Sequence, residues 1–231
     1  MINVVFAADL FRRPALAESM FRDRAAQFHH RLGWEVKVDG RGLEFDQYDD
    51  LNPLYVIMED DDGQHVGSGR LMPTTGRTML KEHFSDLTDG VQIESALIWE
   101  TTRFCVSPQI AGDRRLAMRA PAALLWAGCE IALRSGVEFY AGVFSAPMLR
   151  VYKAAGWMPE VLGRRWTSDG EICAGLWEVT QQVRDALAAR AAPKGEPLEI
   201  TYLPDESRLP TPATLAGARG FAEVSELARH L

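Results

Sequence analysis

The chain has 231 residues, a formal net charge of −7 and a sequence pI near 5.3. This acidic balance argues against nucleic acid or an anionic membrane as the main partner. No apolar run approaches the about 20 residues of a membrane-spanning helix, so we expect no stable membrane insertion. With 47% hydrophobic residues the chain can bury a substantial core, and its length favours one large domain.

The spacing of the cysteines and histidines indicates the cellular compartment and whether the chain binds a metal. Cys105, Cys129 and Cys173 are widely spaced and form no CxxC pair. The five histidines are scattered, and none stands at metal-ligand spacing from a cysteine. The first residues lack a basic region followed by a long apolar stretch, so we expect no signal peptide. We therefore predict a cytoplasmic protein with reduced cysteines and no bound metal.

The first half of the chain predicts helices around a β-hairpin. In chain order we expect a helix at 14–32, a loop at 35–53, strands at 54–58 and 65–72, and a short helix at 78–87. The first helix follows from apolar residues at four-residue spacing. The loop holds five acidic residues, and the aromatic residues among them indicate that it is ordered and functional. The Asp-Gly pair at residues 62 and 63 predicts the hairpin turn.

The second half predicts a strand–helix–strand–helix order that ends in a hairpin. We expect a central strand at 97–106, a helix at 113–135, a strand at 137–144, a helix that Ser145 caps and Gly156 ends, two strands within 160–179, and a helix at 180–191. Pro121 is expected to start or kink its helix. From Pro193 onward we predict an irregular tail with a short helix near 221–230. The order indicates an α/β fold, a single mixed β-sheet sandwiched by helices.

The central strand carries charges that an ordinary buried strand does not need. Glu100 and Arg103 stand three residues apart, so in a regular strand they point to opposite faces. A buried charge costs free energy unless it is paired or used. A structural salt bridge would explain one such pair. The runs at 44–50 and 67–74 also set charges beside aromatic or β-type residues, so we expect all three segments to converge on one site.

These charged segments resemble the signature blocks of the LuxI-type acyl-homoserine-lactone synthases, the autoinducer synthase family. The blocks are Arg24-x-x-x-Phe28, Arg31-Leu-Gly-Trp34, Glu44-Phe-Asp46-Gln-Tyr-Asp49, Gly69-Arg70-Leu-Met-Pro-Thr and Trp99-Glu100-x-x-Arg103-Phe104-x-Val106. They occur in family order over residues ~20–106, and five blocks in register are a specific signal. The segment from Ser145 to Trp157 is similar but weaker. Gln27 departs from the family, which usually has an apolar residue there.

The resemblance implies a fold like that of the GCN5-related N-acetyltransferases and a defined reaction. The amine of S-adenosylmethionine attacks the thioester of an acyl-acyl carrier protein or acyl-CoA. The new amide then lactonises and releases methylthioadenosine. The product is an N-acyl-L-homoserine lactone, a diffusible quorum-sensing signal. S-Adenosylmethionine is a substrate, so no cofactor is implied. We expect residues 1–192 to form the synthase domain and residues 193–231 a C-terminal extension.

The resemblance also assigns site residues, and their chemistry is consistent with it. We predict that Glu100 is the catalytic base and that Arg103 works beside it. The residues expected to bind S-adenosylmethionine are Arg24, Phe28, Trp34, Asp46, Asp49 and Arg70. The aspartates suit its cationic parts, and Arg103 or Arg24 suits its carboxylate. The two aromatic rings suit the adenine and the sulfonium, whereas the guanidinium of Arg70 is expected to lock the carboxylates.

The acyl chain needs a long apolar slot, which in this fold runs between strands 97–106 and 137–144. Its expected lining is Met79, Leu80, Phe84, Gly142, Val143, Met148, Leu149 and Tyr152. Some family members carry a Thr, thought to favour 3-oxo chains, where we place Gly142. We therefore expect a medium or long chain without a 3-oxo group, and a rise in the 3-oxo share in Gly142→Thr. A hydroxyl from Tyr140 or Ser145 would reverse that preference.

A carrier protein is acidic, so we expect a local basic patch on this acidic enzyme. The candidates are Arg114, Arg115 and Arg119, or Arg150 and Lys153. Two other functions stay open. One is an N-acyltransferase that joins acetyl-CoA to an ordinary amine, although residues 106–120 lack the usual glycine-rich turn. The other is a non-catalytic acyl-binding module, which would have no need for so many buried charges.

Overall fold

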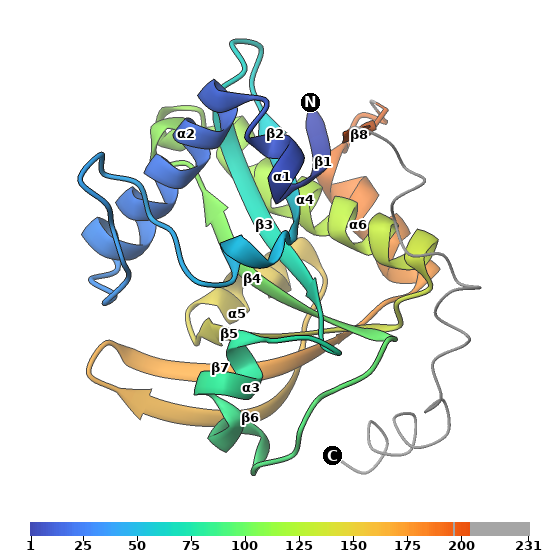
Figure 1. Ribbon diagram of the computed structural model, residues 1–231. Helices are drawn as coiled ribbons and strands as arrows, with labels where there is room; N and C mark the ends of the chain where they lie inside the picture. The colour runs from blue at the N-terminus through green and yellow to red at the C-terminus, as the bar shows by residue number, and fades with distance from the viewer. Residues whose placement is uncertain (196, 204–231) are drawn as a thin grey trace.

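A single eight-stranded mixed sheet lies between two layers of helices (Figure 1). The computed structural model describes residues 1–195 and 197–203. The strands are β1 (Ile2–Phe6), β2 (Leu54–Glu59), β3 (His65–Pro73), β4 (Ile98–Val106), β5 (Phe139–Ser145), β6 (Glu160–Thr167), β7 (Gly170–Glu178) and β8 (Ile200–Leu203). Their order across the sheet is β6-β7-β5-β4-β3-β2-β1-β8. The predicted α/β architecture is confirmed, with β4 at the centre of the sheet.

The helices divide between the two faces of the sheet. They are α1 (Ala7–Leu10), α2 (Pro14–Arg24), α3 (Met79–His83), α4 (Arg114–Ser135), α5 (Met148–Ala155) and α6 (Gln181–Ala191). Shorter turns are η1 (Ala25–Arg31), η2 (Asp49–Leu51), η3 (Ser85–Thr88) and η4 (Pro108–Gly112). Buried apolar residues of α1, α2 and α3 pack on one face, and those of α4, α5 and α6 pack on the other. The predicted helix 14–32 is α2 followed by η1, a π-helix.

Helix α4 is the core helix of its layer. It is long and apolar enough to cross a membrane, yet 56% of its most apolar stretch is buried inside the protein. Asp113 caps its start by accepting a hydrogen bond from the Leu116 amide, and Gly136 ends it in the left-handed conformation. Pro121 lies inside the helix, so it does not start the helix, which was one of the two expected alternatives.

Strands β4 and β5 pair over only a short distance. The parallel ladder joins Ile98–Glu100 to Phe139–Ala141 and then stops. The two strands continue to Val106 and Ser145, so their second halves run unpaired with one another. This divergence opens the middle of the sheet between two strands that carry the predicted site residues.

A β-bulge in β4 corrects the expectation that Glu100 and Arg103 face opposite sides. Arg103 has a left-handed φ of 52°, and the register with β3 shifts between Ser68 and Arg70. The extra residue turns Arg103 onto the face that Glu100 already occupies. Both side chains contact Met79 of α3: Glu100 accepts its amide hydrogen, and the Arg103 guanidinium lies 4.0 Å from its Sδ.

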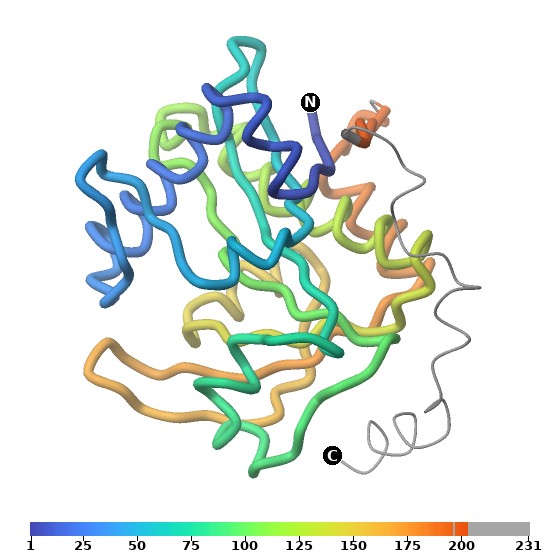
Figure 2. The backbone as a smooth tube through the Cα atoms, viewed as in Figure 1, coloured from blue at the N-terminus to red at the C-terminus, as the bar shows by residue number. Residues whose placement is uncertain are grey.

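Three local details differ from the sequence-based expectations. Strand β1 was not expected, and β8 lies in the tail predicted to be irregular. β8 pairs in parallel with β1, so the two chain segments lie side by side (Figure 2). Ser145 does not cap the next helix, because it ends β5 and Pro147 stands at the N-cap of α5. The short helix predicted near 221–230 lies outside the described residues.

Candidate active site

Three arginines and three carboxylates from separate elements form a buried ion lattice. Arg24 of α2 donates to Glu44 Oε2 at 2.6 Å and makes a bidentate pair with Asp49 at 3.0 and 2.9 Å. Arg70 of β3 binds Asp49 at 2.7 Å, and a bidentate pair joins it to Asp46. The convergence of the three charged segments, which the sequence suggested, is therefore present in the fold.

Arg103 completes the lattice from the bulge in β4. Its guanidinium lies 3.0 Å from Glu44 Oε1 and 2.8 Å from Asp46 Oδ2. Glu44 therefore bridges Arg24 and Arg103, a role that the sequence-based assignment did not give it. The formal charges of the six side chains cancel, which is the condition for burying so many of them together.

The lattice holds its two aspartates in the ionised form. Burial by itself raises the pKa of Asp49, but the charges of Arg24 and Arg70 outweigh it and lower the net pKa. Asp46 behaves in the same way: burial raises its pKa, and the hydrogen bond and charge of Arg70 bring it below the ordinary value. Tyr55 adds a hydrogen bond to Asp49 at 2.5 Å. At neutral pH the aspartates are therefore fixed anions.

The six lattice residues divide into an inner and an outer set. Arg24, Glu44 and Arg70 are at most 1% exposed, and Asp49 is 6% exposed. None of these four lines the adjacent cavity. Asp46 and Arg103 have side chains 11% and 10% exposed and do line it. The inner set therefore positions the outer set, and only the outer pair faces the cavity.

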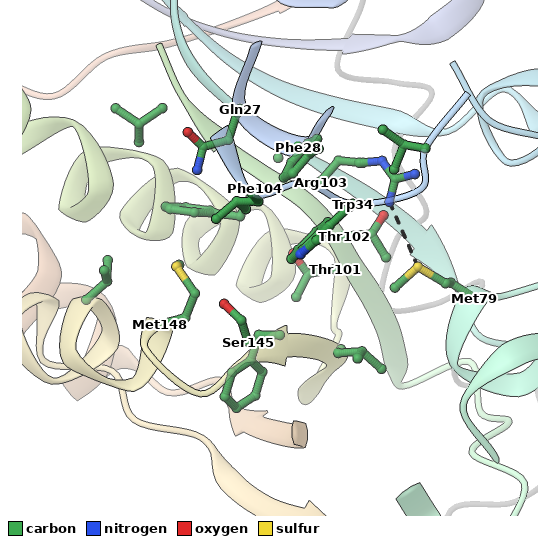
Figure 3. Close-up of a pocket in the computed structure, with 18 of the residues that line it drawn as sticks. Gln27, Phe28, Trp34, Met79, Thr101, Thr102, Arg103, Phe104, Ser145 and Met148 are labelled. Atoms are coloured by element: carbon green, nitrogen blue, oxygen red, sulfur yellow. Dashed lines mark hydrogen bonds between the residues drawn. The ribbon is translucent and has the colours of Figure 1, made fainter. Parts of the chain in front are cut away.

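The cavity beside Asp46 and Arg103 has a volume of about 1650 Å³. It exceeds the roughly 300–1,000 Å³ of an ordinary small-molecule pocket, so it has room for two substrates. Phe28 and Trp34 form its wall as a stacked pair, with ring centroids 5.3 Å apart and planes 9° from parallel. The Arg103 guanidinium lies 5.4 Å from the centroid of the Phe28 ring (Figure 3).

Phe28 reaches this wall from a π-helical turn. The segment η1 carries it together with Gln27, whose side chain also lines the cavity. Such turns inside helices are frequently found at functional sites. The departure from the family pattern at Gln27 thus lies on the cavity surface rather than in the core.

Glu100 lies behind the cavity wall. It is fully buried, and its two carboxylate oxygens accept the amide hydrogens of Met79 at 3.0 Å and Leu80 at 2.6 Å. Burial raises its pKa, and those two hydrogen bonds offset part of the rise. Glu100 does not line the cavity, whereas the Met79 side chain does (Figure 3).

The cavity continues through the gap between β4 and β5. Residues from both diverging strands line it, and beyond them it reaches α4 and α5. The predicted acyl-pocket residues that line it are Met79, Phe84, Gly142, Val143, Met148 and Tyr152. Leu80 and Leu149 do not line it. Figure 3 shows Ser145 and Met148 across the cavity from Phe28 and Phe104.

Gly142 is the first residue of β5 beyond its ladder with β4. A side-chain carbon at this position would lie 2.6 Å from the backbone oxygen of Thr101. The glycine therefore allows a close approach of two backbones.

Sequence reasoning left several cavity residues unassigned. Thr101, Phe104 and Trp177 line the cavity, and Thr102 accepts a hydrogen bond from Arg70 Nε at 2.9 Å. The two threonines lie inside the quoted Glu100-to-Arg103 block, so their position was the available signal. Trp177 had none. Within residues 1–195 and 197–203, no group of three or more His, Cys, Asp or Glu side chains could hold a metal ion.

Known proteins resemble this chain at the level of both sequence and structure. A family model described as autoinducer synthase matches residues 9–185. An acyl-homoserine-lactone synthase from Rhizobium etli is 41% identical over 165 residues, covering 71% of this chain and 77% of that protein. The structure of a CoA-dependent acyl-homoserine lactone synthase, BjaI, with SAM and isopentyl-CoA has a TM-score of 0.78 at 26% identity. It covers 94% of this chain and 98% of that one.

A more distant likeness concerns the fold alone. An N-acetyltransferase structure from Lactobacillus plantarum matches with a TM-score of 0.51 at 15% identity, over 78% of this chain and 99% of that one. The family model and the relatives thus define an acyl-transferring enzyme, and its sheet is like that of an N-acetyltransferase. The chain belongs to the autoinducer synthase family. Its reaction makes an N-acyl-L-homoserine lactone, a quorum-sensing signal, from S-adenosylmethionine and an acyl thioester, and releases methylthioadenosine. The predicted family and function are confirmed.

Proposed function

We propose that the two substrates meet inside the single cavity. S-Adenosylmethionine binds at the end that Asp46, Arg103, Phe28 and Trp34 line, and the acyl chain lies in the part that crosses the sheet. One observation carries this proposal. Of the six lattice residues only Asp46 and Arg103 face the cavity, and from them the cavity continues as an apolar passage between β4 and β5.

The outer lattice pair supplies the direct ionic contacts in this proposal. The Asp46 carboxylate attracts the cationic part of S-adenosylmethionine, and the Arg103 guanidinium binds its carboxylate. The inner residues Arg24, Asp49 and Arg70 act as positioning residues. They form their hydrogen bonds with one another and with the outer pair. Phe28 and Trp34 pack against the adenine, and their ring faces attract the sulfonium.

Glu100 is proposed as the base for amide formation. The substrate ammonium must lose a proton before its nitrogen attacks the thioester carbonyl and displaces the thiol of CoA or of the carrier protein. A buried carboxylate with a raised pKa suits the task of taking that proton. Because Glu100 lies behind Met79, the proton reaches it through a water or through a small shift of the first turn of α3. The substrate carboxylate then attacks the carbon beside the sulfonium, closes the lactone and expels methylthioadenosine.

The acyl donor is a carrier-protein or CoA thioester. We propose that its carrier approaches from α5, because Arg150 is exposed and lines the cavity and Lys153 is exposed on the same helix. Arg119 suits this role less well, since its Nε donates to the Ala191 carbonyl at 2.6 Å. The cytoplasm is the proposed compartment, and the three buried free cysteines support a reducing one.

The assignment of the outer pair is tested with purified enzyme, S-adenosylmethionine and matched acyl-CoA and acyl-carrier-protein donors. Lactone and methylthioadenosine are quantified by mass spectrometry. Asp46→Asn should raise KM for S-adenosylmethionine and lower kcat/KM at least tenfold. Asp61→Asn, which changes an exposed acid in the β2–β3 turn, is the charge-matched control and should leave both constants unchanged. Equal kinetics for the two variants would contradict the proposed contact.

A further inference from the structure

Four polar aromatic residues line the end of the cavity that lies against α4 and α5. Two of them are fully engaged with backbone carbonyls. Tyr140 donates its hydroxyl to Gly128 O at 2.9 Å, and Trp157 donates its indole N–H to Glu178 O at 2.8 Å. These two residues obey the usual rule that a buried polar group finds a partner.

Tyr152 and Trp177, the other two residues, make no such hydrogen bond. The Trp177 Nε1 atom is buried and has no hydrogen-bond partner among the described residues. In the same part of the chain the Tyr152 hydroxyl makes no hydrogen bond, and burial alone raises its pKa. The residues are 3% and 6% exposed, and their rings touch at a centroid distance of 5.1 Å. Both line the cavity.

A buried donor without a partner is costly, and phenylalanine would fill either position without that cost. Here one such group, the Trp177 N–H, stands beside the Tyr152 hydroxyl on the wall of a substrate passage. We propose that Tyr152 and Trp177, called the polar pair below, are specificity-determining residues that bind an oxygen atom on the acyl chain. The chemical class of substrate is an acyl thioester with a hydroxyl or keto oxygen remote from the reacting carbonyl.

The position of the indole places this oxygen beyond C3 of the chain. A side-chain carbon at Gly142 would lie 3.6 Å from Trp177 Cζ3, so that corner of the ring faces the gap between β4 and β5. The N–H is at the opposite corner of the indole. A chain that passes Thr101 and Gly142 therefore meets the carbon edge first and the N–H later. This step rests on the proposed path of the acyl chain, which sets C3 beside Gly142.

The sign of the effect follows from desolvation. A hydroxyl that leaves water for a purely apolar slot loses its hydrogen bonds, so an apolar slot rejects it. An oxygen that accepts from Trp177 Nε1 and exchanges a hydrogen bond with Tyr152 recovers them. Each recovered bond corresponds to roughly two- to tenfold in kcat/KM.

The test uses the full chain, S-adenosylmethionine and a panel of twelve-carbon acyl thioesters. The panel contains the unsubstituted chain and chains with one hydroxyl placed from C3 to C12. The wild-type enzyme should prefer at least one donor hydroxylated beyond C3 over the unsubstituted donor. Tyr152→Phe and Trp177→Phe should each lower that preference by roughly two- to tenfold, measured within each variant as the ratio of kcat/KM for the hydroxylated donor to kcat/KM for the unsubstituted donor.

Tyr140→Phe is the matched control, because it removes a hydroxyl that already has a partner. It should lower thermal stability and leave the donor preference unchanged, whereas Tyr152→Phe should leave stability unchanged. The proposal is overturned if the unsubstituted donor is best at every hydroxyl position. It is also overturned if only C3 hydroxylation helps, or if the preference persists in both polar-pair variants. A failure of the reaction itself looks different, since no donor, the unsubstituted one included, would then yield lactone.

Discussion

Replacing Asp49 by Asn separates the supporting role of the inner lattice from the substrate contacts proposed for the outer pair, Asp46 and Arg103. Asp49 accepts two hydrogen bonds from Arg24, one from Arg70 and one from Tyr55. The variant keeps the shape of the side chain but removes one of three buried negative charges. Two of the three arginines then lose an ionic partner at a position that is 6% exposed.

The magnitude follows from the burial of this site. Removing one member of a buried ion pair costs about 3–5 kcal/mol, because the other charge is left without compensation. For a domain of this size that corresponds to a fall in Tm of roughly 6–20 °C. Asp46→Asn should cost less stability, since its side chain is 11% exposed and water reaches the remaining charges. We therefore expect Asp49→Asn to lose more stability than Asp46→Asn, and Asp46→Asn to show the larger rise in KM for S-adenosylmethionine.

The assay is thermal or urea unfolding of both variants beside steady-state kinetics on the folded protein, repeated from pH 7 to pH 3. The lattice lowers the pKa of Asp49 in the folded state. Its contribution to stability is therefore complete above the unfolded-state pKa of about 4 and is lost as the pH falls through the folded-state pKa. The stability gap between wild type and Asp49→Asn should be constant from pH 7 to about pH 5 and narrow in stronger acid. An unchanged Tm in Asp49→Asn, or a gap that widens in acid, would refute the reasoning.

Four further predictions concern the reaction. Glu100→Gln should lose most acyl transfer, because an amide cannot take a proton. It should also lower Tm, because the new NH₂ group would face the Met79 and Leu80 amide hydrogens, which donate to the carboxylate in the wild type. Turnover at the wild-type rate would exclude Glu100 as the base. Asp46→Asn and Arg103→Ala should lose less together than the sum of their separate losses, and a double-mutant cycle of kcat/KM that proves additive would place them in independent sites. Acyl thioesters of equal length should react faster without a 3-oxo group, by roughly ten- to a hundredfold, because Gly142 has no side chain that could donate a hydrogen bond to the 3-oxo oxygen. If the enzyme instead prefers the 3-oxo thioester and Ser145→Ala abolishes that preference, the hydrogen bond comes from Ser145. Gly142→Thr is no longer expected to raise the 3-oxo share, since its side chain would collide with the Thr101 carbonyl and should reduce stability and turnover of both donors alike.

Much of the candidate site was predictable because its charged residues lie in short segments of the sequence. Charged residues stand among apolar ones in three segments: the loop before β2, strand β3 around Arg70, and the Glu100-to-Arg103 block. Together these segments resemble one family. The hairpin turn at Asp60–Gly63 and the helix end at Gly136 were predictable for a similar reason. Each depends on residues within a few positions of one another.

Other features depended on partners far along the chain. The bulge that turns Arg103 onto the same face as Glu100 exists because β4 must stay in register with β3 while Arg103 reaches Glu44, which is 59 residues away. β8 is a strand because its backbone finds the free edge of β1, across almost the whole length of the described chain. No local pattern encodes either of these pairings.

The sequence by itself determined the class of fold, the family and the residue types that we propose for the S-adenosylmethionine site, because periodicity, turns and charged motifs act over short distances. Only the tertiary structure decided which of those charges face the cavity. It kept Arg24, Asp49 and Arg70 inside the lattice, set Glu100 behind Met79, and left Asp46 and Arg103 open. It also brought Trp177 of β7 against Tyr152 of α5. Burial and contact of this kind come from packing between distant elements, and a linear pattern does not specify them.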